Sequence, residues 1–227
     1  MRLAHAQAAL DDDDNTKPAA TTASEASESE ARLGVDLRLR QVFVPRSIIE
    51  LFVDKASGGS SETGFGADFI RRKGDFEVQL GIEYEAINVQ PGIWIEKGKD
   101  PTNGGADHVF FRDFAWFTIE ATFLNHTSFN KYVALRYGGG AGIGILKGSV
   151  NRTDSICNSP DPAQANDNTC HDAPNPNDNT PYNLPPVFPV INAIVGLQIK
   201  PTDNIVINVE TGIRTLPFFG TSIGFMF

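Results

Sequence analysis

The sequence lacks any long hydrophobic run and is poor in positive charge. No stretch of its 227 residues approaches the ~18–20 consecutive apolar residues that a membrane-spanning helix needs, so helical spans are excluded. Membrane-spanning strands are not excluded, because they carry their apolar residues in alternation. Lys and Arg number 19 against 28 Asp and Glu, and the formal net charge of -9 argues against a nucleic-acid partner.

Cysteine is scarce, and both cysteines lie in the same polar segment. Cys157 and Cys170 would close a short loop, which in an exported protein usually means a disulfide worth roughly 2–3 kcal/mol. A metal site needs more ligands than these two, and only His171 stands beside them. We therefore expect a disulfide in oxidising surroundings, and neither a metal nor a cofactor.

Residues 1–31 have the composition of a disordered acidic tail. An acidic run, Asp11 to Asp14, precedes a segment of Ala, Ser, Thr and Glu that cannot offset the entropy of ordering. Residues 1–9 resemble the end of a secretory signal peptide, with small-x-small cleavage patterns but no apolar segment before them. A signal-peptide remnant and an ordinary tail both stay open.

Beyond the tail, eight stretches alternate bulky apolar residues with glycine, polar or charged ones, which is the period of a β-strand. Short connections between them alternate with long ones at about 45–63, 90–108 and 147–189, as in an up-and-down meander. We expect an all-β protein with an eight-stranded antiparallel up-and-down transmembrane β-barrel over residues 32–227. The stretches lie at about 33–40, 64–70, 76–85, 116–123, 133–145, 191–200, 205–214 and 218–227.

The charged residues of these stretches all lie on the face opposite the aliphatic one. A soluble ligand-binding barrel would turn its apolar face inward, whereas a membrane barrel turns that face to lipid, so alternation alone fits both. The charged set is Asp36, Arg38, Arg40, Asp68, Glu77, Glu83, Glu85, Glu120, Arg136, Lys200, Glu210 and Arg214.

Three features favour the membrane. The apolar stretches run about nine to eleven residues, the length that a tilted strand needs to cross hydrocarbon. Aromatic residues gather near strand ends, as in the interfacial girdles of membrane barrels. One strand alternates glycines, which leave room for long charged side chains. The aromatics are Phe69, Phe76, Phe123, Tyr132 and Phe227 towards the short connections and Phe110, Phe111 and Phe114 towards the long ones, and the glycines are Gly138, Gly140, Gly142 and Gly144.

The terminal stretch carries a likeness to a known family. Residues 218–227 alternate small residues with a bulky apolar face that includes Ile223 and the final Phe227. With the strand count and the pattern of connections, the chain resembles the small eight-stranded outer-membrane β-barrels of Gram-negative bacteria, the group of the OmpA transmembrane domain and OmpX. The resemblance covers about residues 32–227. It implies a place in the bacterial outer membrane, contact with outer-membrane lipid, and a C-terminal signal ending in Phe227 that the barrel-assembly machinery reads.

The barrel interior is expected to be filled, because eight strands enclose a space just wide enough for side chains. If the turn after the fourth stretch centres on Ser128, Glu120 and Arg136 lie opposite each other and form an ion pair in the lumen. The alternative is that lumenal water solvates both charges.

Catalytic motifs are weak. His126-Thr-Ser128 is similar to the His-x-Ser of lipid A deacylase barrels, but the topology predicts that it lies in a short periplasmic turn with no acid beside it. Glu83 and Glu85 share one strand, so they are interpreted as lumen charges. His108 and His171 have no companion residues that would make a catalytic site.

The resulting hypothesis is a non-enzymatic scaffold in the outer membrane that displays its long surface loops to a protein partner. Two alternatives stay open: a narrow channel lined by the lumen charges, and, from a different class, a soluble barrel that binds an apolar ligand.

Overall fold

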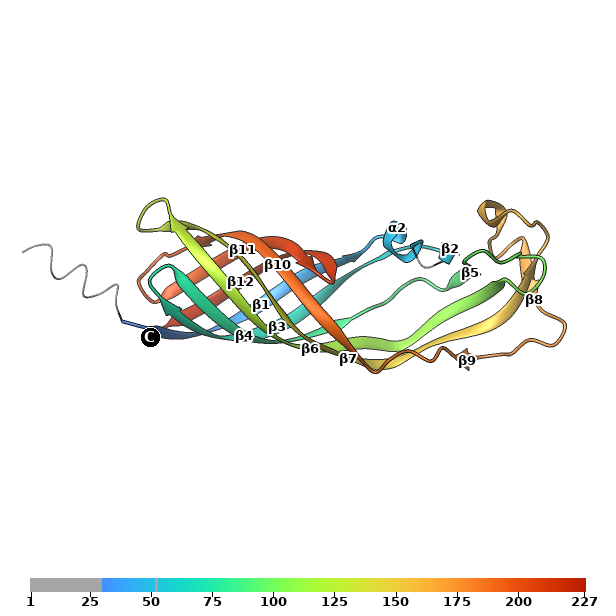
Figure 1. The fold of residues 1–227 in the computed structure, drawn as a ribbon, viewed down its shortest axis with the longest axis horizontal. Coiled ribbons are helices and arrows are strands. Elements are labelled where there is room, and N and C mark those ends of the chain that lie inside the picture. Colours follow the sequence, from blue (N-terminus) through green and yellow to red (C-terminus); the bar gives the residue numbers. More distant parts are fainter. Residues whose placement is uncertain (1–29, 52) are drawn as a thin grey trace, which may run out of the picture.

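The computed structural model describes residues 30–51 and 53–227, and a closed ring of eight antiparallel strands forms one end of its long axis (Figure 1). Strands that are consecutive around the meander pair with each other, and the first pairs with the last to close the ring. The predicted eight-stranded up-and-down barrel is confirmed. Its strands are β1 (Arg32–Val44), β3 (Ser60–Lys73), β4 (Phe76–Ala86), β6 (Ala106–Ser128), β7 (Val133–Cys157), β10 (Val187–Ile199), β11 (Ile205–Arg214) and β12 (Leu216–Met226).

The outside of the ring is apolar and its inside is charged. Leu37 and Ile191 face outward and are 68% and 70% exposed, whereas Arg40 and Glu83 face inward and are each 1% exposed. A soluble barrel would have the opposite arrangement, so that alternative is wrong. The ring is a transmembrane barrel whose outer wall meets lipid.

Much of the long connections, predicted as loops, is β-structure. Strand β6 begins at Ala106 and β7 continues to Cys157, so this hairpin runs well past the ring. We call residues 45–51, 53–59, 87–114 and 147–186 the extension. It continues the long axis of the barrel at the end away from the C-terminus (Figure 1). Its other strands are β2 (Val53–Lys55), β5 (Gly92–Glu96), β8 (Cys170–Asp172) and β9 (Thr180–Pro181).

Helices are few and short in the described part of the chain. The extension holds α2 (Arg46–Ile49) and a 3₁₀ turn, η1 (Pro162–Gln164). No helix among the described residues is long and apolar enough to cross a membrane.

A β-bulge separates the ring from the extension. The register of β6 with β7 shifts between Arg112 and Ala115, and Asp113 there has a φ of 46°. Gly148 faces this point with a φ of 82°, and a Cβ on it would collide with the Asp113 carbonyl oxygen. A glycine is therefore required where the hairpin leaves the barrel wall.

The predicted acidic tail lies almost wholly outside the described residues, and its disorder stays a prediction.

Candidate functional site: the filled lumen and the outer extension

A network of buried ion pairs occupies the middle of the lumen. Arg38 lies 2.8 Å from Asp68 and 2.7 Å from Glu83, and Arg40 lies 3.0 Å from both Glu83 and Glu210. Further pairs are Arg38–Glu120, Arg136–Glu77, Arg136–Glu210, Arg214–Glu83 and Arg214–Glu85. Each guanidinium has at least two carboxylate partners, so the charges that the sequence assigned to the inner face hold one another across the ring.

The predicted pair Glu120–Arg136 is wrong. Both side chains face the lumen, but in the register of β6 with β7 Glu120 lies opposite Gly142, and Arg136 lies opposite His126. The turn does not centre on Ser128, which is still part of β6.

Each of the two residues binds other partners instead. Arg136 Nη1 donates to Glu210 Oε2 at 2.5 Å, and its Nη2 lies 3.2 Å from Glu77 Oε1. Glu120 accepts from Arg38 Nη2 at 3.1 Å and from Asn192 Nδ2 at 3.0 Å. Water is therefore not needed to solvate either charge.

The position predicted for His126-Thr-Ser128 is also wrong, because these residues end strand β6 and do not form a turn. His126 is 3% exposed, and its Nε2 lies 3.0 Å from Glu77 Oε2. Polar residues at the rim of a membrane strand look like turn residues in the sequence. The turn itself is marked by Asn130, whose side-chain oxygen accepts from the backbone N–H groups of Tyr132 (2.8 Å) and Val133 (2.9 Å).

The other acids and histidines considered as catalytic lie apart. Glu83 and Glu85 both face the lumen and contact Arg214. His108 lies in the extension beside the ring of Phe110, and His171 is exposed in β8. Among residues 30–51 and 53–227, no three His, Cys, Asp or Glu side chains come together in a way that could hold a metal ion.

The glycines of β7 let side chains from β6 and β10 meet across this strand. Asn192 Nδ2 donates to Thr122 Oγ1 at 2.8 Å, and both residues lie opposite Gly140. A Cβ on Gly140 would lie 2.7 Å from the Thr122 Cα atom. Higher in the strand, Gly144 lies opposite Phe188, whose ring packs against Trp116 with the ring centroids 5.2 Å apart. These glycines were predicted to leave room for long charged side chains, but at Gly140 and Gly144 the space is occupied by an amide–hydroxyl hydrogen bond and an aromatic pair.

Apolar clusters lie on both sides of the charge network in the lumen. Near the short turns, Ile70, Val206 and Met226 pack together. Towards the extension, Val42, Phe218 and their neighbours form a second cluster, and the Arg40 guanidinium lies 4.3 Å from the Phe218 ring centroid. The interior is thus occupied along its length, as expected for eight strands.

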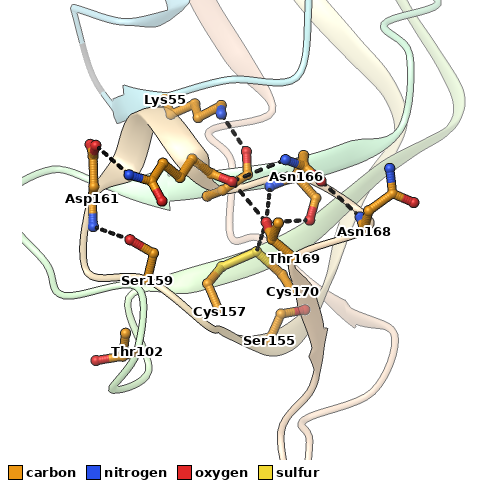
Figure 2. Close-up of a disulfide and its surroundings, with 12 residues drawn as sticks. Lys55, Thr102, Ser155, Cys157, Ser159, Asp161, Asn166, Asn168, Thr169 and Cys170 are labelled. Carbon is orange, nitrogen blue, oxygen red and sulfur yellow. Dashed lines mark hydrogen bonds between the residues drawn. A yellow bond between two sulfur atoms is a disulfide. The ribbon is translucent and has the colours of Figure 1, made fainter.

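The disulfide predicted from the cysteine count is present at the outer part of the extension. Cys157 of β7 is bonded to Cys170 of β8, which lies directly opposite it (Figure 2). Ala165 of the disulfide loop and Ile93 and Ile95 of β5 pack with the two cysteines in a small buried core. Lys55 Nζ donates to the carbonyl oxygens of Ala163 (2.9 Å) and Ala165, which ties β2 to the same loop.

A polar cluster lies on the other face of β7 in the extension. Arg152 Nη1 lies 3.1 Å from Asp107 Oδ2 and 3.3 Å from Glu96 Oε1. The Tyr182 hydroxyl donates to Asp107 at 2.8 Å. Burial and this hydrogen bond to Asp107 raise the pKa of Tyr182, so its hydroxyl stays protonated and keeps donating.

An apolar cavity of about 580 Å³ lies beside this cluster. The ring of Phe111 stands between those of Trp94 and Phe114, with centroid distances of 6.0 Å and 5.5 Å. The sequence marked Phe111 and Phe114 as girdle residues but gave no sign of a cavity, because Trp94 and Leu184 come from distant segments. The lining residues are Val53, Trp94, Glu96, Lys97, Phe111, Phe114, Val150, Tyr182 and Leu184.

The disulfide loop and the segment after it are acidic. Residues 153–199 contain no Lys or Arg. We call residues 158–180, which bear most of the acids of this stretch, the acidic tip. The aspartates of the stretch are Asp154, Asp161, Asp167, Asp172 and Asp178.

The closed ring, the apolar outer wall and the charged interior define a small transmembrane β-barrel of the outer-membrane type. The resemblance seen in the sequence is confirmed as a resemblance of fold, and bacterial outer membranes are where barrels of this type reside. No protein-family model matches the chain, and no curated protein matches its sequence.

Several solved structures are similar to the chain. One is Ail, the attachment invasion locus protein of Yersinia pestis, in complex with the heparin analogue sucrose octasulfate; it has 14% identity and a TM-score of 0.42 and covers 87% of this chain and 99% of that one. Neisserial surface protein A has 10% identity and a TM-score of 0.45 over 87% of this chain and 98% of its own. The N-terminal β-barrel domain of Pseudomonas aeruginosa OprF has 11% identity and a TM-score of 0.36 over 87% and 100%.

Proposed function

We propose that the protein is a non-enzymatic scaffold of the outer membrane whose extension presents an acidic tip to a protein partner. The observation that carries this proposal is the contrast between a lumen filled with mutually paired charges and an outer end stiffened by paired strands and a disulfide. Binding surfaces commonly sit on loops held by a rigid scaffold. The partner's matching surface is basic, because the tip carries Asp residues without Lys or Arg.

Charge neutralisation at the tip tests this proposal. A variant with Asp161→Asn, Asp167→Asn, Asp172→Asn and Asp178→Asn is compared with Asp203→Asn, which lies in a short turn at the other end of the barrel. In affinity capture from outer membranes, we expect a protein held by the wild type at low salt, retained by Asp203→Asn and lost with the tip variant or at high salt. Equal capture by both variants would rule out the tip as the binding surface.

The channel alternative makes a different prediction. Because the lumen is blocked by ion pairs and by apolar clusters, we expect the purified barrel to give no steady conductance in planar bilayers. Reproducible single-channel steps would favour the channel over the scaffold.

The terminal residue is proposed to be the assembly signal. Phe227 is 61% exposed on the outer wall, and its N–H donates to the Leu33 carbonyl at 2.8 Å, whereas Met226 packs inside against Ile70 and Val206. Deleting Phe227 is expected to reduce the amount of barrel assembled in the membrane more than Met226→Ala does. Met226→Ala is expected to lower the unfolding midpoint of barrels that have already assembled. Normal assembly of the truncated chain would show that Phe227 is not part of the assembly signal.

A further inference from the structure

We propose that the aromatic cavity of the extension binds a single-chain anionic amphiphile of the outer leaflet, with its headgroup at Lys97 and its chain running towards the membrane. This site goes beyond the scaffold function and requires no protein partner. It is lined by Trp94, Phe111, Phe114 and Leu184 and is open on one side, and its volume of about 580 Å³ is in the range of small-molecule sites.

The cavity adjoins a hollow that reaches the lipid-facing wall. This second hollow, of about 630 Å³, shares Phe111 and Phe114 with the first, and the rest of its lining is mixed, with Tyr84 beside the charged Asp113 and Lys147. Tyr84 is 46% exposed on β4, on the outer face that meets lipid. An acyl chain that leaves the membrane at Tyr84 would pass the polar side of this hollow and contact the rings of Phe114 and Phe111 on its way to Trp94.

The positive charge of Lys97, at the end of the cavity away from the membrane, fits an anionic headgroup. Lys97 lines the cavity near Trp94, and no carboxylate lies within 4.0 Å of its ammonium among the residues that the structure describes. Its Nζ donates to the Leu51 carbonyl at 2.7 Å, which holds it at the cavity rim with donors to spare. The neighbouring acid, Glu96, is already engaged by Arg152.

An amphiphile bound in this way has the same orientation as a lipid of the outer leaflet, with its polar end outermost and its chain directed towards the bilayer. Basic and aromatic side chains together are typical of the membrane–water interface. A wholly apolar ligand would leave the Lys97 ammonium without a counter-ion, and a two-chain lipid would have to place a second chain outside the bilayer.

Tryptophan fluorescence tests the proposal, because the chain has two Trp residues. In a Trp116→Phe variant, Trp94 is the remaining tryptophan and reports on the cavity. The variant is reconstituted in nanodiscs and titrated with dibrominated stearate, whose bromine atoms quench indole on contact. We expect saturable quenching of Trp94 to less than about half of its starting emission. Lys97→Gln should raise the half-saturating concentration about tenfold, as expected for loss of a charge-assisted hydrogen bond.

Lys99→Gln is the matched control, since Lys99 is exposed two residues away and does not line the cavity. It should leave the titration unchanged. Phe111→Ser should abolish saturation while the barrel keeps its heat-modifiable gel mobility, which shows that the ring is folded.

Three outcomes would overturn the proposal. Quenching by chain-brominated phosphatidylcholine to the same extent would mean that the cavity is simply immersed in the bilayer. Equal affinity for the methyl ester of dibrominated stearate would show that the site does not recognise an anionic headgroup. Absence of quenching by dibrominated stearate in the folded barrel would show that the cavity does not bind such an amphiphile.

Discussion

Arginines in the lumen and on the extension bind pairs of acids in very different surroundings. Arg136 binds Glu210 and Glu77 with side chains that are all 2% exposed. Arg152 binds Asp107 and Glu96 at similar distances, and although the Asp107 side chain is only 6% exposed, that of Arg152 is 30% exposed and that of Glu96 is 43% exposed. Breaking a buried pair leaves a charge that water cannot reach, whereas an exposed charge regains its hydration. The same kind of contact therefore holds the barrel together but contributes little to the extension.

The largest expected effect separates these two arginines. Arg136→Met leaves Glu77 and Glu210 short of a cation inside the ring, and the free energy of unfolding should fall by about 3–5 kcal/mol. Arg152→Met should cost only about 1 kcal/mol, because water reaches this site and the Tyr182 hydroxyl still donates to the Asp107 carboxylate. Urea unfolding in lipid, followed by heat-modifiable mobility, measures both, and equal losses would contradict the comparison.

The disulfide should stabilise the extension alone. With 13 residues of sequence separation between Cys157 and Cys170, chain entropy predicts a local loss of about 3 kcal/mol when both are replaced by Ser. We expect limited proteolysis to cut within 158–169 in the variant, while the urea midpoint of the barrel stays unchanged. A shift of that midpoint would show that the two regions are coupled.

Gly140 in the barrel wall should be less tolerant of substitution than Gly58 in the extension. Gly140→Ala places a methyl group against the Thr122 backbone and should cost about 1–3 kcal/mol by overpacking. Gly58→Ala is the control, because a Cβ at Gly58 meets nothing within 4 Å. The urea midpoints of the two variants compare them directly, and identical midpoints would mean that the barrel wall adjusts freely around the added methyl group.

The smallest expected effect is a coupling energy. Arg136 contacts Glu210 directly but not Glu120, so a double-mutant cycle of Arg136→Met with Glu210→Gln should show a larger coupling than one with Glu120→Gln. The Glu120 cycle retains an indirect path through Arg40, which contacts both acids. A stronger coupling with Glu120 would restore the pairing expected from the sequence.

Alternation predicted the ring and the direction in which each strand faces, because lipid outside and charge inside require opposite residues at every second position. It could not predict register, since the polar end of β6 at His126 and Ser128 resembles a turn. The short strands of the extension could not be predicted from the sequence either. Strands β2, β5, β8 and β9 each have five or fewer residues and depend on distant partners for their hydrogen bonds. The cavity combines Trp94 and Leu184, a proximity that no local pattern encodes.

The closing pair of strands has a consequence for the order of folding. The hairpin of β6 and β7 joins residues that are close in sequence, from Ser128 opposite Ala134 outward, and such local contacts form quickly. The pairing of β1 with β12 brings Gly34 opposite Met226, near opposite ends of the described chain, and must wait for the loop between them to close. We therefore expect the hairpins of consecutive strands, such as β3–β4, β6–β7 and β11–β12, to form before the β1–β12 seam, so the nascent barrel stays open between β1 and β12 until insertion is complete.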